Sequence, residues 1–68
     1  MRKQHWETHL YTFAVMLTQG DRIKPENLAG VRAKAKMRGH TEGDCQLVER
    51  DPQAFIRDGF AALGRIAA

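Results

Sequence analysis

The segment of residues 25–38, followed by Gly39, carries helix signals at both of its ends. Pro25 stands where a first helical residue would, because its missing N–H costs nothing at that position. Glu26 follows in the first turn and Lys36 lies in the last turn, where each charge suits the helix dipole. Gly39 is typical of the left-handed residue that closes a helix. These signals predict one helix that carries the densest positive charge of the chain.

The same segment also alternates apolar and basic side chains at a period of two, which is typical of a half-buried strand. Alanine, lysine, arginine and methionine are good helix formers, and alanine and lysine are depleted in strands. We therefore predict a helix for residues 31–38 and keep a strand as the alternative. On that helix the apolar stripe would be Leu28, Val31 and Ala35, with Arg32 and Lys36 on one flank and Lys34 and Arg38 on the other.

A second helix is predicted for residues 4–19. Its apolar side chains recur at spacings of four, three and four, which places them on one side of a helix: Trp6, Leu10, Phe13 and Leu17. This stripe would begin the core at Trp6. Tyr11, Phe13 and Val15 also alternate, so a strand over residues 10–18 stays open as the alternative.

The C-terminal third begins with weaker signals and ends with strong ones. Thr41 with Asp44 loosely resembles a capping box, and residues 45–50 fit a short helix or a strand. Asp51 as cap and Pro52 as first residue then mark a helix start. The apolar side chains that follow at three- and four-residue intervals predict one core-forming helix: Phe55, Ile56, Phe60, Leu63 and Ile66.

These elements predict a single small domain over residues 1–68, because no linker or repeat divides the chain. A chain of 68 residues buries only about 60% of its unfolded surface, so the core is modest. We expect an all-α fold, a small three- or four-helix bundle. The alternative is an α+β fold in which a short sheet is packed by the C-terminal helix. A second copy of the chain could complete the core as a homodimer.

The sequence predicts a soluble, cytoplasmic protein. Its single cysteine, Cys45, excludes an internal disulfide and suits a reducing compartment. The longest apolar run, residues 13–17, is far shorter than the ~20 residues that cross a bilayer. Near the N-terminus, His5, Glu7 and His9 stand where a signal peptide would need an apolar core. No membrane association is expected.

Positive charge is unevenly distributed along the chain. The net charge is +3 and the isoelectric point is about 9.5. No acid occurs in residues 27–41, and four acids follow directly: Glu42, Asp44, Glu49 and Asp51. Lysine and arginine neutralise phosphates, so the basic segment predicts a nucleic-acid site formed by Arg22, Lys24, Arg32, Lys34, Lys36 and Arg38. The other interpretation is a solvated helix face.

Metal binding and catalysis find little support in the residue types present. Four side chains have zinc-ligand chemistry, but their spacing matches no familiar zinc motif: His5, His9, His40 and Cys45. The sequence leaves open whether they meet. No phosphate-cradling glycine loop and no organised nucleophile and base are present. We predict no metal, no cofactor and no enzymatic activity.

Residues 32–62 place small and aromatic residues in a particular order, at Ala35, Gly39, Cys45, Phe55, Gly59, Phe60 and Ala62. In this order the segment resembles the ribosome modulation factor family of short basic proteins. It departs from that family at Gln46, where proline is usual, and in having phenylalanines for tryptophans. The resemblance implies contact with the ribosome or ribosomal RNA and assigns no contact to a single residue.

The sequence therefore predicts a small regulatory protein that binds nucleic acid, or a nucleoprotein such as the ribosome, through its basic helix. The alternative is an adaptor or inhibitor of phage or plasmid origin that docks an exposed apolar or charged face on a host protein. Salt distinguishes the two, because phosphate binding weakens as ionic strength rises.

Overall fold

The computed structural model describes residues 4–68, which form five α-helices and two single-turn 3₁₀ helices. In chain order these are η1 (His5–Glu7), α1 (His9–Leu17), η2 (Gly20–Arg22), α2 (Pro25–Met37), α3 (Glu42–Arg50), α4 (Pro52–Asp58) and α5 (Ala61–Ala67). No strand occurs in this part of the chain. The predicted all-α bundle is confirmed. The strand alternatives for residues 10–18 and 31–38 are wrong, because helix propensity and capping prevail over the period-two pattern there.

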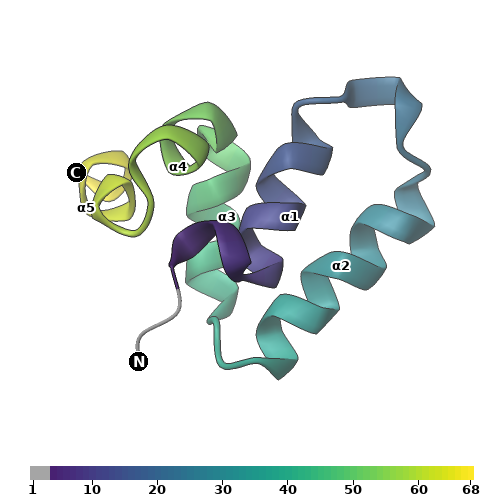
Figure 1. Ribbon diagram of the computed structural model, residues 1–68, viewed down its shortest axis with the longest axis horizontal. Helices are drawn as coiled ribbons and strands as arrows, with labels where there is room; N and C mark the ends of the chain where they lie inside the picture. Colours follow the sequence, from purple (N-terminus) through teal and green to yellow (C-terminus); the bar gives the residue numbers. More distant parts are fainter. Residues whose placement is uncertain (1–3) are drawn as a thin grey trace.

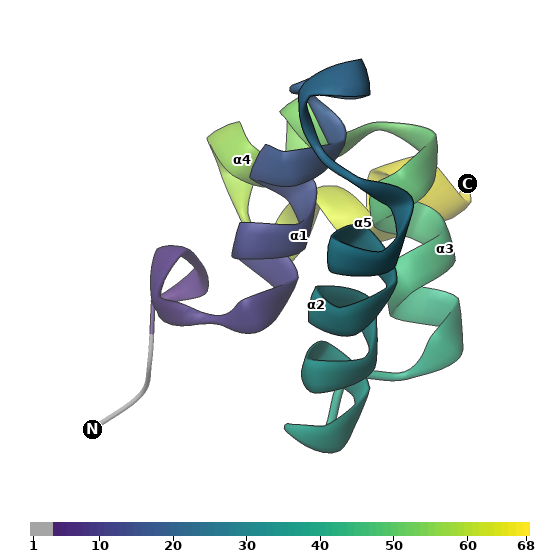
Figure 2. The ribbon, with the colours of Figure 1, turned by 90° about the vertical axis from the view of Figure 1, so that its right-hand side faces the viewer.

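The central helix is α1, and α2, α3 and α4 pack around it (Figure 1). α2 runs antiparallel beside α1, and α5 packs against α3 and α4 (Figure 2). Because its neighbours cover much of its surface, α1 carries no lysine, arginine, aspartate or glutamate. Leu10, Phe13 and Ala14 of this helix are completely buried.

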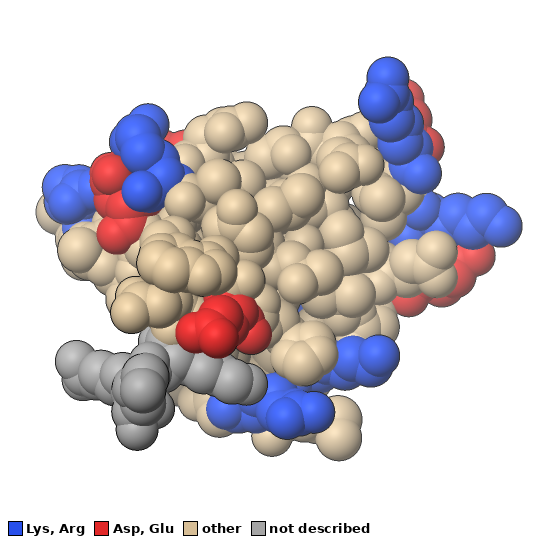
Figure 3. All heavy atoms as spheres, viewed as in Figure 1, with Lys and Arg blue, Asp and Glu red and all other residues tan. Residues whose placement is uncertain are grey.

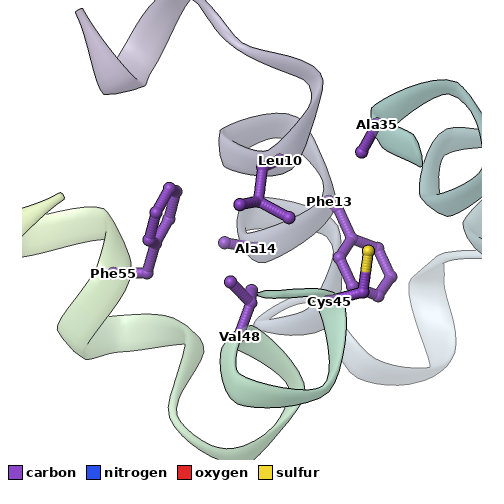
Figure 4. Packing of buried hydrophobic residues seen from close by; sticks show 7 residues of the cluster. All are labelled: Leu10, Phe13, Ala14, Ala35, Cys45, Val48 and Phe55. Atoms are coloured by element: carbon purple, nitrogen blue, oxygen red, sulfur yellow. The ribbon is translucent and has the colours of Figure 1, made fainter. Parts of the chain in front are cut away.

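The core joins residues of α1, α2, α3 and α4 (Figure 4). Its fully buried members are Leu10, Phe13, Ala14, Ala35, Cys45, Val48 and Phe55. Half-buried apolar side chains pack against them, namely Tyr11, Leu17, Leu28, Val31, Ile56 and Leu63. Most of the predicted scaffold is thus in place. Figure 4 shows Leu10, Ala14 and Val48 between the rings of Phe13 and Phe55.

The predicted helix over residues 4–19 is broken at Thr8. This residue is extended (φ −100°, ψ 157°), and its hydroxyl accepts a hydrogen bond from the Tyr11 backbone N–H (3.2 Å) and donates one to the carbonyl of His5 (2.7 Å). Thr8 is therefore the N-cap of α1, and the residues before it form η1. The prediction that Trp6 begins the core stripe is wrong, because the break leaves Trp6 57% exposed.

The predicted C-terminal helix is likewise two helices, separated at Gly59. The backbone of Gly59 (φ 73°, ψ −150°) lies in a region that is essentially restricted to glycine. Above it lies His5, whose Nε2–H donates to the Ile56 carbonyl (3.1 Å) and so fixes η1 on α4. A Cβ at position 59 would lie 2.9 Å from His5 Nδ1. The turn also leaves Phe60 43% exposed, so its prediction as a scaffold residue is wrong.

The helix signals between residues 24 and 52 are confirmed. Pro25 begins α2, and Gly39 follows its cap with φ 103°. Residues 45–50 belong to a helix, α3, whose N-cap is Thr41. The Thr41 hydroxyl accepts from the Asp44 N–H (3.0 Å), and the Asp44 carboxylate accepts from the Thr41 N–H (3.2 Å). This reciprocal pair is a capping box with aspartate in the usual place of glutamate.

No helix within residues 4–68 has both the length and the apolar character that a bilayer-spanning segment needs.

Candidate functional site

The basic side chains of α2 point to two flanks, as the helical spacing predicts. Arg32 and Lys36 face α3, where both form ion pairs. Lys34 and Arg38 lie one turn apart on the other flank and are exposed. Within residues 4–68 they form no ion pair. The two flanks of the helix therefore differ in how much positive charge they offer to a ligand.

The flank that faces α3 is neutralised by acids. Arg32 Nη1 donates to Glu42 Oε1 (2.7 Å), and Arg32 Nε donates to Glu49 Oε2 (3.1 Å). Lys36 Nζ donates to the same Glu42 oxygen (3.0 Å), and Gln46 Nε2 donates to Glu42 Oε2 (3.3 Å). The cluster joins the end of α2 to the start of α3. Two of the predicted phosphate-binding cations are thus already engaged with carboxylates.

Hydrogen bonds from Arg32 and then Lys36 lower the pKa of Glu42 from its ordinary 4.5 to about 2. The hydrogen bond with Glu42, then that with Glu49, raises the pKa of Arg32. The three side chains lie at the surface, where water and salt screen such pairs. The cluster consequently orients α3 on α2 and contributes modestly to stability.

This cluster predicts a pH-dependent effect of Glu42→Gln. A carboxylate whose pKa is lower in the folded state stabilises the fold above its unfolded pKa, and that contribution disappears as the pH falls through the folded value. We expect the melting temperature of the variant to lie below that of the wild type above pH 4.5 and to converge with it toward about pH 2. Thermal unfolding followed by circular dichroism at a series of pH values measures this difference.

Glu26→Gln is the matched control, because Glu26 forms no ion pair with the described residues. Its melting temperature should not follow the same curve. If the difference in melting temperature between Glu42→Gln and the wild type stays constant from neutral pH to about 2, the stabilising role of the Glu42 carboxylate is contradicted.

Arg22 and Lys24 lie at the opposite end of α2 from Arg38, roughly 20 Å away by the rise of an α-helix. Both are exposed. On the face shown in Figure 3, lysine and arginine occur at separate places along the edge, and the centre over α1 carries no charge. The six predicted cations therefore do not form one continuous basic patch.

The four candidate metal ligands are not brought together as one group, although His9 and His40 line the same pocket. The ring of His5 packs against Phe55, with 5.7 Å between the ring centroids, whereas Cys45 is buried in the core. Burial raises the pKa of the Cys45 thiol, which keeps it protonated and unreactive. Within residues 4–68 no three histidine, cysteine, aspartate or glutamate side chains gather as a metal site requires.

The Arg38 end of α2 borders an open pocket. Its walls come from three separate parts of the chain: Thr8 and His9 at the start of α1, Arg38 and His40 just after the end of α2, and Phe60 between α4 and α5. Together with Lys34, one turn before Arg38, the residues His9, Arg38, His40 and Phe60 form what we call the α2-end surface. It combines exposed cationic chemistry with an exposed aromatic ring.

Aromatic rings continue from this surface across the molecule. His40 stacks on Phe60 (centroids 5.8 Å apart, interplanar angle 18°), and the rings of Phe60 and Phe55 are nearly perpendicular, with 5.3 Å between their centroids. His5 then links Phe55 to Trp6, with 5.2 Å between the centroids of His5 and Trp6. Two rings of this series, Trp6 and Phe60, are open to solvent.

Sequence reasoning missed His9, His40 and Phe60 as members of one surface. Thr8 was an available signal, because threonine is a favoured N-cap and a helix that begins at His9 leaves Trp6 outside it. Gly59 was a second signal, since an interior glycine can end a helix and turn the next residue outward. The meeting of these segments at the Arg38 end follows from the packing of the helices and had no local signal.

No protein-family model, no curated protein and no solved structure matches the chain.

Proposed function

We propose that this protein binds single-stranded nucleic acid through the α2-end surface. The observation that carries the proposal is the meeting of unpaired cations and the exposed ring of Phe60 at one end of α2. Lys34 and Arg38 are exposed and form no ion pair within the described chain. Phe60 is 43% exposed.

Each of these features suits an unpaired strand. Arginine and lysine neutralise the phosphates, and bases of any identity stack on aromatic faces. A duplex hides the faces of its bases, so exposed rings favour a single strand. The resemblance to the ribosome modulation factor family stays a prediction that no family model supports; it would imply RNA or a nucleoprotein that exposes single-stranded RNA.

The proposed site contains fewer cations than the six predicted from the sequence. Arg32 and Lys36 are bound to Glu42, so a phosphate would have to compete with a carboxylate that already accepts hydrogen bonds from both. Arg22 and Lys24 lie at the far end of α2. Lys34 and Arg38 are the remaining members, and we expect them to supply most of the phosphate contacts.

The test is fluorescence anisotropy of labelled single-stranded RNA and DNA at several salt concentrations, with two charge-matched double variants. Lys34→Gln with Arg38→Gln removes one lysine and one arginine from the α2-end surface. Arg22→Gln with Lys24→Gln also removes one arginine and one lysine, but from the other end of the helix. We expect the first variant to weaken binding by at least ~10-fold and the second by less than ~3-fold, because only the first loses direct phosphate contacts.

Salt dependence provides an independent readout. Each phosphate contact to a single strand contributes about 0.7 to the slope of log K against log salt, so losing two contacts should reduce the slope by about 1.4. Circular dichroism would establish that both variants fold, as substitutions at exposed positions should allow. Equal weakening in the two variants would assign binding to net charge alone. Absence of binding at low salt would refute the proposal.

A second candidate function, docking on a host protein, is favoured by a different observation. The centre of the face in Figure 3, over α1, is uncharged. Within α1, Thr12 is exposed and Val15 and Met16 are half-buried. An interface on this face would be largely apolar and would persist at high salt, whereas phosphate binding would not.

A further inference from the structure

The pocket at the α2-end surface has dimensions that suit one small ligand. Its volume is about 400 Å³, at the lower end of the range of small-molecule sites, about 300–1,000 Å³. Three segments that are distant in sequence contribute its walls: Thr8 with His9, Arg38 with His40, and Phe60. A pocket of this volume is in the range of sites that hold one small ligand such as a nucleotide.

Three of the lining side chains are nitrogen donors that can carry positive charge: His9, Arg38 and His40. None of them is engaged by a side-chain hydrogen bond or ion pair to residues 4–68. No acid lines the pocket. The arginine guanidinium has a planar fork of donors that matches phosphate oxygens. The polar chemistry of the pocket therefore suits an anion.

The hydroxyl of Thr8 is already used within the protein, since it donates to the carbonyl of His5 and accepts from the backbone of Tyr11. It caps α1 and adds no free donor to the pocket. The polar contacts to a ligand would thus come from the guanidinium of Arg38 and the rings of His9 and His40. Arg38 and His40 are neighbours in sequence, and the tertiary fold brings His9 of α1 to them.

One wall of the pocket is aromatic. The ring of Phe60 is 43% exposed although it is large and apolar, and His40 stacks on it at an interplanar angle of 18°. Phe55 supports the same ring from inside the molecule by an edge contact at 5.3 Å. A supported, partly exposed ring beside cationic donors offers a base a surface to stack on.

We infer that this pocket binds the phosphorylated end of a nucleic-acid strand, with the terminal phosphate held by Arg38, His9 and His40 and the adjoining base against Phe60. This inference rests on the proposed function. A terminal phosphate monoester carries a charge of −1.5 to −2 near neutral pH, whereas an internal phosphodiester carries −1. Three donors that converge on one pocket favour the terminal group.

The experiment compares oligonucleotides of one sequence that differ only in their ends, by the same anisotropy measurement. One carries a 5′-phosphate, one a 3′-phosphate and one hydroxyls at both ends. We expect one of the phosphorylated strands to bind at least ~10-fold more tightly than the hydroxyl-ended strand. Free adenosine monophosphate is the third probe, because a free nucleotide shares the same chemistry.

Two variants test the residues. Arg38→Lys keeps the charge and removes the guanidinium fork, so it should retain binding of the hydroxyl-ended strand and lose most of the preference for the phosphate. Phe60→Leu keeps an apolar side chain at an exposed position and removes the stacking surface, so it should weaken all strands by ~3-fold or more. Arg22→Lys is the matched control and should change neither quantity.

The outcomes separate this inference from the proposed function. If phosphorylated and hydroxyl-ended strands bind equally well, the inference is wrong and strand binding by the α2-end surface stands. If adenosine monophosphate binds and no strand does, the pocket is a free-nucleotide site, and both the inference and the proposed function are wrong. Two results together would also overturn the placement of the strand end in this pocket. In the first, Arg38→Lys still prefers the phosphorylated strand; in the second, Phe60→Leu binds all strands as tightly as the wild type.

Discussion

Replacing Phe55 with alanine is expected to lower the free energy of unfolding by about 3–5 kcal/mol. Phe55 is completely buried, and its ring contacts both His5 and Phe60. Truncation would remove a large apolar surface and leave a cavity where η1, α1 and α4 meet. A domain of 68 residues has a total stability of only about 3–10 kcal/mol, so the variant would keep little of it.

Urea unfolding followed by circular dichroism measures this loss, with Phe60→Ala as the control. Phe60 is an aromatic ring of the same type that is 43% exposed, so its truncation should cost less than half as much. Equal losses in the two variants would show that the core does not depend on Phe55 more than on the exposed ring. A loss below about 1 kcal/mol for Phe55→Ala would contradict its central position in the packing.

Replacing Gly59 with alanine should be the second most damaging change, with a loss of about 2–4 kcal/mol. Two causes add. The backbone at φ 73° and ψ −150° is strained for any residue with a Cβ. The new methyl group would also lie 2.9 Å from His5 Nδ1, closer than a carbon contact allows. Thermal or urea unfolding of the purified variant measures the loss.

Gly64→Ala is the matched control for this prediction. Gly64 lies inside α5, and a Cβ there meets nothing within 4 Å. Alanine should therefore stabilise the helix by about 0.5–1 kcal/mol. Combining Gly59→Ala with His5→Ala would separate the two causes, because it removes the clash and keeps the backbone strain. Opposite signs at positions 59 and 64 are the expected result, and destabilisation of similar size at both would contradict it.

Local sequence signals predicted the middle of the fold well. The Pro25 start, the Gly39 stop and the capping box of Thr41 with Asp44 each depend on residues close in sequence, and each is present in the structure. The errors occurred where two local sequence patterns favoured different structures. At Thr8 the hydrophobic spacing fitted a continuous helix, whereas the threonine side chain offered the backbone a different hydrogen bond. The capped helix start at Thr8 prevails because it lets His5 Nε2–H donate a hydrogen bond to the Ile56 carbonyl of α4.

The candidate site was predicted less well, because its charges depend on how helices meet. A basic segment followed by an acidic one is visible in the sequence. The short connection between α2 and α3 folds Glu42 back on α2. This brings Glu42 within hydrogen-bond distance of Arg32 and Lys36. The pocket at Arg38 is lined by three segments of the chain, and no spacing in the sequence relates His9 to Phe60.

The buried thiol of Cys45 makes the motions of the core observable in time. It is the single cysteine of the chain, it is completely buried, and its burial raises the pKa of the thiol. A thiol reagent reacts with the thiolate and so requires access to the sulfur. Labelling of the native protein therefore occurs only during moments when α3 separates from its neighbours, and its rate counts those openings. The rate at which Cys45 is labelled thus measures how often the core of the unmodified protein opens.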